Sequence, residues 1–121
     1  MLLIEDSIYS ADLNIRELER AGFAVQHSVV AGRKAMEEAL SGGQWDIILC
    51  DNSMPGFDAQ RAIEVRNRLA GQVPFVVVSE DISKEDIMRV MEEGCSAYLD
   101  KKNLNMLGTV VESILTVKRI G

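Results

Sequence analysis

Asp51 directly follows the apolar run Ile47–Cys50 and precedes a loop sequence that contains Pro55 and Gly56. A short apolar run bounded by turn-forming residues is typical of a strand that is buried on both faces. Packing does not explain a carboxylate at the end of such a strand. In open α/β sheets, ligands bind at the carboxyl ends of the strands. Asp51 is therefore the first candidate functional residue.

Three other apolar runs of the chain are also followed by polar or charged residues, which are Glu5 and Asp6, Ser79, and Lys101. At an effective dielectric near 20, three carboxylates about 5 Å apart repel one another by about 3 kcal/mol per pair. One lysine cannot balance this charge, whereas a hard divalent cation can. The three acids, Glu5, Asp6 and Asp51, therefore predict a Mg²⁺ site.

This set of residues favours phosphoryl transfer. Mg²⁺ takes one or two carboxylates and keeps several waters, which leaves one oxygen of Asp51 free to act as a nucleophile. The ammonium of Lys101 and the hydroxyl of Ser79 would hold the other oxygens of an incoming phosphoryl group. Asp51 is the predicted acceptor.

Five alternations of strand and helix position these residues. The expected strands are Leu2–Ile4, Phe23–Val25, Ile47–Cys50, Phe75–Val78 and Ala97–Leu99. The expected helices follow Ser7 and Ser83 and span Val29–Leu40, Ala59–Leu69 and Leu104–Lys118. This alternation predicts a parallel sheet covered on both faces by right-handed crossovers. We expect a flavodoxin-like (βα)5 domain with the strand order 2-1-3-4-5, which places the first and third strands side by side.

Four segments of the sequence together resemble the receiver domain of two-component response regulators. They are Leu-Ile-Glu-Asp (3–6), Cys-Asp-Asn-Ser-Met-Pro-Gly (50–56), Val-Val-Val-Ser (76–79) and Ala-Tyr-Leu-Asp-Lys (97–101). They occur in the family's order and spacing, and the resemblance covers essentially the whole chain, residues 1–121. It implies a phosphorelay protein in which Asp51 accepts a phosphoryl group from a sensor histidine kinase or a histidine phosphotransfer protein.

The resemblance also assigns roles to individual residues. It implies that Mg²⁺ is held by Glu5, Asp6, Asp51 and the backbone carbonyl of Ser53. Ser79 and Lys101 match the family's hydroxyl and lysine positions, and Tyr98 matches its switching aromatic residue. Ser79 replaces the more usual threonine, Glu80 stands where a small residue is common, and Lys102 stands where a proline usually sits. None of these departures removes a required chemical group.

Composition narrows the function classes. A chain of 121 residues with 47% hydrophobic residues is one folded domain, and a net charge of −6 argues against nucleic-acid binding. Cys50 and Cys95 lack metal-type spacing, and His27 has no partner for a metal site. No signal peptide or membrane span is present, so we expect a cytoplasmic protein with reduced thiols. The first expected strand begins at Leu2, directly after Met1. We therefore also expect the chain to be one domain of a longer protein.

Other functions remain open at this stage. A haloacid-dehalogenase-type phosphatase also uses a strand-end aspartate, but it places a second aspartate two residues later, where this chain has Ser53. A pseudo-receiver that only binds partners would tend to lose an acid or the lysine. A nucleotide or flavin binder would need a phosphate loop in place of Glu5-Asp6-Ser7. We therefore expect a phosphoacceptor module, not an enzyme with a separate substrate.

The last helix suggests where the signal leaves. Leu107, Val111 and Ile114 have inward spacing, yet the same helix also carries further apolar residues: Met106, Val110, Leu115 and Val117. Switching of Tyr98 would reshape the face formed by the fourth helix, fifth strand and last helix. This face would bind a downstream protein, an attached output domain or a second copy of the chain.

Overall fold

The computed structural model describes residues 1–52, 54–80 and 82–120, with side chains described as far as residue 115. Its parallel five-stranded sheet has the order β2-β1-β3-β4-β5, which confirms the expected flavodoxin-like topology. The strands are β1 (Leu2–Ile4), β2 (Ser28–Val30), β3 (Ile48–Cys50), β4 (Phe75–Ser79) and β5 (Ala97–Asp100). The helices are α1 (Ile8–Arg20), α2 (Arg33–Gly42), α3 (Ala59–Leu69), α4 (Lys84–Glu92), the 3₁₀ segment η1 (Lys101–Met106) and α5 (Leu107–Ile120).

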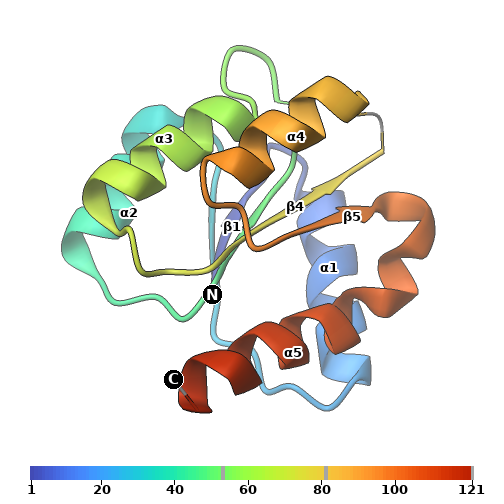
Figure 1. The fold of residues 1–121 in the computed structure, drawn as a ribbon. Helices are drawn as coiled ribbons and strands as arrows, with labels where there is room; N and C mark the ends of the chain where they lie inside the picture. Colours follow the sequence, from blue (N-terminus) through green and yellow to red (C-terminus); the bar gives the residue numbers. More distant parts are fainter. Residues whose placement is uncertain (53, 81, 121) are drawn as a thin grey trace.

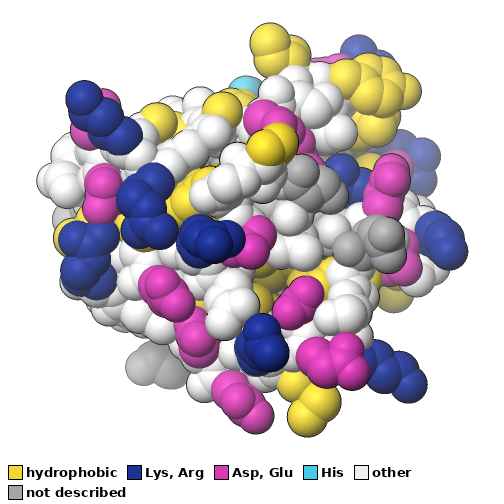
Figure 2. Space-filling view, turned by 90° about the horizontal axis from the view of Figure 1, so that it is seen from above, with side chains coloured by type: hydrophobic (Ala, Val, Ile, Leu, Met, Phe, Trp, Pro, Cys, Tyr) yellow, Lys and Arg dark blue, Asp and Glu magenta, His cyan; other side chains and the backbone are white. Residues whose placement is uncertain are grey.

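The helices cover the two faces of the sheet unequally. Helices α2, α3 and α4 lie above it in Figure 1, and α1 and α5 lie below. Seen from above, over α3 and α4, the surface carries acidic and basic side chains close together, with scattered hydrophobic ones (Figure 2). Exposed ion pairs account for part of this mixture, including Arg61–Asp58 within α3's first turn and Arg68–Glu37 between α3 and α2.

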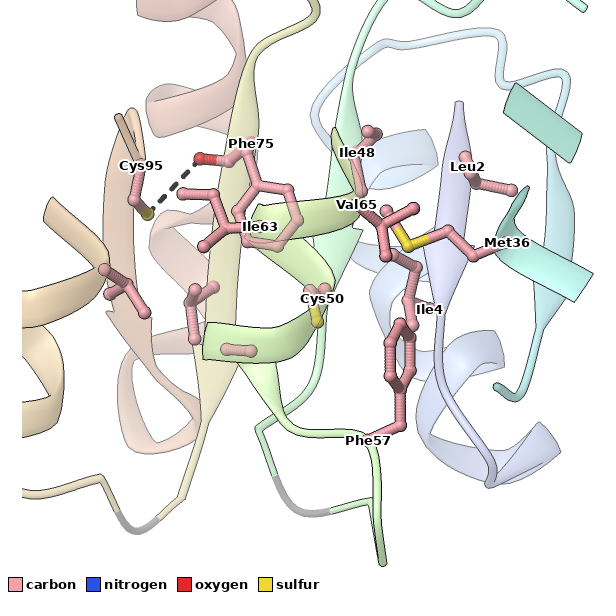
Figure 3. Close-up of a cluster of buried hydrophobic side chains, with 14 of the residues drawn as sticks. Leu2, Ile4, Met36, Ile48, Cys50, Phe57, Ile63, Val65, Phe75 and Cys95 are labelled. Atoms are coloured by element: carbon pink, nitrogen blue, oxygen red, sulfur yellow. Dashed lines mark hydrogen bonds between the residues drawn. The ribbon is translucent and has the colours of Figure 1, made fainter. Parts of the chain in front are cut away.

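The alternation of side chains along each strand gives two buried clusters, one on each face. Leu2, Ile4, Ile48 and Cys50 face α2 and α3, where Met36 and Ile63 complete the packing shown in Figure 3. Leu3 and Leu49 point to the opposite face, where they join Leu18 of α1 and Leu107 of α5. Strands β1 and β3, and β4 as far as Val78, are therefore apolar because both of their faces are covered.

Both cysteines are free and buried, as the sequence predicted. The Cys95 thiol donates to the carbonyl of Phe75, at 3.4 Å (Figure 3). Burial raises the pKa of both thiols, which keeps them protonated and weakly nucleophilic. They are part of the core.

The expected second strand at Phe23–Val25 is wrong: residues 23–27 form a connection, and β2 spans Ser28–Val30. Phe23 and Val25 instead pack against the cluster beneath α1 and α5. They also help to line a cavity of about 790 Å³ at the amino edge of the sheet, together with Trp45. The apolar character of Phe23 and Val25 thus serves packing between helices, and not strand pairing.

Two helix boundaries also differ from those expected. The second helix begins at Arg33 instead of Val29, because Val29 and Val30 pair with β1. The last α-helix begins at Leu107 instead of Leu104, since residues 101–106 form the 3₁₀ segment η1. Burial explains part of the wide apolar arc expected of the last helix, because Val110, Ile114 and Leu115 pack against the core. Met106 lies in η1 and is exposed, and the side chain of Val117 lies outside the described part of the chain.

Candidate functional site

The pairing of β1 with β3 brings three carboxylates together. Ile4 lies opposite Cys50, and the backbone N–H of Asp51 donates to the carbonyl of Ile4, at 3.0 Å. Glu5 and Asp51 therefore leave neighbouring strands at the same level. One oxygen each from Glu5, Asp6 and Asp51 lies within 4.8 Å of the others. Glu5 and Asp51 are buried, and Asp6 is exposed.

Lys101 reaches this cluster from the β5 edge of the sheet. It is the first residue of η1, directly after β5, and its Nζ lies 3.5 Å from Oδ2 of Asp51. In the strand order, β4 separates β3 from β5, and Ser79 is the last residue of β4. Ser79 is fully buried, and its hydroxyl has no hydrogen-bond partner among the described residues.

The surroundings of Glu5 are ones that a bound cation would stabilise. Burial, followed by the nearby charge of Asp51, raises the pKa of Glu5 to about 7. Its Oε1 accepts from the backbone N–H of Ser7 at 3.1 Å, whereas its buried Oε2 has no partner in the described part of the chain. A hard divalent cation would supply the missing partner and lower the cost of ionising both acids. The donor set, made of carboxylate oxygens, fits Mg²⁺.

The structure also places the other candidate residues. Tyr98 lies in β5 opposite Val77 and is half-buried against the cluster that α2, α3 and α4 cover. Glu80 is exposed directly after Ser79. His27 is exposed at the amino end of β2, away from the acids. Ser53, the expected source of a carbonyl ligand, lies outside the described residues.

One residue of this edge was missed by sequence reasoning. The side-chain Oδ1 of Asn52 accepts a hydrogen bond from the backbone N–H of Ala59, at 3.0 Å. The only signal in the sequence was an asparagine after a strand, and asparagine is common in turns for many reasons. The sequence does not show that the partner of this side chain is the backbone N–H of Ala59, seven residues later.

Comparison with known proteins identifies the family. Residues 1–112 match the family model of the response regulator receiver domain. The chain belongs to this family. It is 32% identical over 108 residues to the peroxide stress-activated histidine kinase mak2 of Schizosaccharomyces pombe, an alignment that covers 83% of this chain and 5% of mak2. The chain spans between 5% and 44% of the lengths of the curated relatives that it matches.

Solved structures of receiver domains share the fold. The phosphorylated cyanobacterial phytochrome response regulator RcpA is 27% identical, with a TM-score of 0.67 over 93% of this chain and 88% of its own. The receiver domain of the Pseudomonas aeruginosa histidine kinase PA1611, solved with magnesium in its active-site cleft, is 19% identical, with a TM-score of 0.78 over 95% of each chain. The function predicted from the sequence, phosphorelay signal transduction, is therefore confirmed for this receiver domain. Among the residues described, no helix combines the length and the hydropathy that crossing a lipid bilayer requires.

Proposed function

We propose that this receiver domain accepts a phosphoryl group on Asp51 in a Mg²⁺-dependent reaction. The observation that carries the proposal is the convergence on Asp51 of two further acids and one lysine. A domain that served only to bind partners would have no need for a buried carboxylate beside Glu5, because like charges destabilise each other there. All the groups that the chemistry requires are retained.

Glu5, Asp6 and Asp51 would hold the metal, together with the backbone carbonyl of Ser53. When bound, Mg²⁺ supplies the positive charge that lets a phosphoryl group approach these carboxylates. An oxygen of Asp51 attacks phosphorus, the bond from phosphorus to the donor histidine nitrogen breaks, and the imidazole leaves with the electron pair. The Lys101 ammonium, already beside Asp51, neutralises charge on the transferred oxygens. The buried Ser79 hydroxyl is available to donate to one of them.

The donor would be a histidine kinase or a histidine phosphotransfer protein, and the signal would pass to an output domain or a downstream protein. We place the output surface on α4, β5 and the last helix, η1 with α5. Met88 and Met91 of α4 and Met106 of η1 are exposed there, and Tyr98 lies half-buried between core and surface. A movement of Ser79 toward the phosphoryl group would open space for the ring of Tyr98. The rotation of Tyr98 into that space would change this surface.

Mass spectrometry after treatment with acetyl phosphate and Mg²⁺ tests the proposal. We expect one labile phosphoryl group on Asp51 and none in Asp51→Asn. Omission of divalent ions should also abolish the label. Label that persists at full level in either control would contradict the assignment.

A further inference from the structure

We infer that Asn52 is a positioning residue for phosphoryl transfer, because its side chain fixes the backbone that directly follows Asp51. The inference rests on the proposed function. The backbone N–H of Asp51 is bound to β1 through the carbonyl of Ile4, at 3.0 Å. The next side chain, that of Asn52, is bound to the start of α3 through Ala59, also at 3.0 Å. Asp51 is thus held by the sheet on one side and by a helix on the other.

The first turn of α3 is a firm point of attachment. Ala59 and Ala62 are fully buried, so this end of the helix is fixed by the core. The first N–H groups of a helix lack partners within it, so they are strong donors for side chains outside. Asp58 accepts from the backbone N–H of Arg61 at 3.0 Å, and Asn52 accepts from that of Ala59. The two acceptors come from opposite ends of the loop between β3 and α3.

Other contacts hold the far part of this loop. Met54 and Phe57 are buried in the core, and the guanidinium of Arg33 lies 5.3 Å from the centre of the Phe57 ring. Gly56 has a φ of 75°, a left-handed conformation that glycine adopts without strain. These contacts fix the part of the loop that is distant from Asp51. The bond between Asn52 and Ala59 instead joins the two ends of the loop, next to the acceptor carboxylate.

Loss of this bond should therefore affect chemistry more than stability. The Asp51 carboxylate must face Lys101 at 3.5 Å and at the same time lie within reach of the two acids that follow β1. A shift of about 1 Å in a reacting group can slow a reaction by roughly 100-fold. For Asn52→Ala we expect labelling by acetyl phosphate to slow by about tenfold, a partial loss of alignment on this scale.

Asp58→Ala provides the control, because it removes contacts to the same helical turn, a backbone hydrogen bond and an ion pair with Arg61, and leaves the bond between Asn52 and Ala59 in place. Asn52→Asp is the conservative variant, because it keeps an acceptor oxygen. We would measure the labelling rate, the Mg²⁺ affinity, the unfolding midpoint in urea and amide exchange at Ala59 in all variants. Asn52→Ala should speed exchange at Ala59 and slow labelling. Asn52→Asp should restore slow exchange at Ala59, whereas its added charge beside Asp51 repels the anionic donor. Asp58→Ala should label within about twofold of wild type, less than about 0.4 kcal/mol in barrier height.

Two results would overturn the inference alone. One is wild-type labelling in Asn52→Ala despite faster exchange at Ala59. The other is equal slowing in Asn52→Ala and Asp58→Ala, which would show that the bond only stabilises α3. A wild-type chain that takes no label on Asp51 would instead overturn the proposed function, and this inference with it.

Discussion

Nζ of Lys101 lies 3.5 Å from Oδ2 of Asp51, although β4 separates the strands from which the two residues emerge. The lysine therefore spans the edge of the sheet to reach the carboxylate. Lys102, its neighbour in sequence, is exposed, and its backbone N–H donates to the Asp100 carboxylate at 2.9 Å. Two adjacent lysines thus have different surroundings.

This difference allows a matched test of Lys101. Lys101→Met should slow labelling of Asp51 by acetyl phosphate, because a charged hydrogen bond contributes about 1.5 to 3 kcal/mol, or roughly 10- to 150-fold in rate. Lys102→Met removes the same charge from the chain and should label at the wild-type rate. Equal rates for the two variants would show that Lys101 acts only through overall charge.

Glu80 should restrict access to Asp51. Its exposed carboxylate follows Ser79 directly and would repel small anionic donors and hydroxide. We expect Glu80→Ala to speed labelling by acetyl phosphate and to shorten the lifetime of the phosphorylated protein. Glu85→Ala, an exposed acid on α4, is the control for net charge. Rates within about twofold of wild type, roughly 0.4 kcal/mol, would show that Glu80 does not influence the site.

Glu5 should make the stability of the metal-free protein depend on pH. Its pKa is raised from 4.5 to about 7, mainly by burial. Between these values the folded state holds a proton that the unfolded chain has lost, so the free energy of unfolding should fall as pH rises and level off above about 7. Urea unfolding at pH 5, 6, 7 and 8 measures this slope. Glu5→Gln should remove it, and an unchanged slope in this variant would assign the effect to other groups.

Arg66 should stabilise the fold without affecting the site. Its buried guanidinium donates to the carbonyls of Gly71 and Gly94, both at 2.7 Å. Arg66→Met should cost about 2 to 3 kcal/mol, because it removes two hydrogen bonds made by a buried charged group. Arg68 lies on the same helix as Arg66, and Arg68→Met breaks an exposed ion pair with Glu37 of α2, which should cost less than about 1 kcal/mol. Urea unfolding compares the two, and similar losses would show that the buried bonds contribute little.

The proposed output surface predicts a response to beryllofluoride, a mimic of the acyl phosphate. Sedimentation should detect a second copy bound in its presence, and amide exchange should change across α4, β5 and α5. Asp51→Asn, which cannot carry the mimic, should show neither effect. An unchanged monomer with unchanged exchange would exclude signalling through the surface that contains Met88, Met91 and Met106.

The inner strands could be predicted because burial on both faces leaves a clear apolar signal. Strand β2 could not, since it lies at the edge of the sheet and the side chains of Ser28 and Val29 are exposed. The apolar residues nearby, Phe23 and Val25, gave the stronger signal, yet they pack beneath helices. The hydrophobicity of Phe23 and Val25 correctly predicted that their side chains pack against the core, but it wrongly predicted that they lie in a strand.

The convergence of Glu5, Asp6, Asp51 and Lys101 followed from strand ends alone, because parallel strands share one carboxyl edge. The role of Asn52 did not follow, because its partner is a backbone N–H that any sequence supplies. Side-chain types reveal which groups meet at a site. They reveal much less about which contacts to the backbone fix the positions of those groups.

Trp45 has a consequence for spectroscopy. It is the only tryptophan in the chain, and its indole Nε1–H donates to the carbonyl of Ala39 at 2.9 Å. It precedes β3, at the edge of the sheet opposite Asp51. Its emission should therefore report global unfolding while remaining insensitive to Mg²⁺ or a phosphoryl group, so fluorescence can compare the stabilities of all these variants without interference from the state of the site.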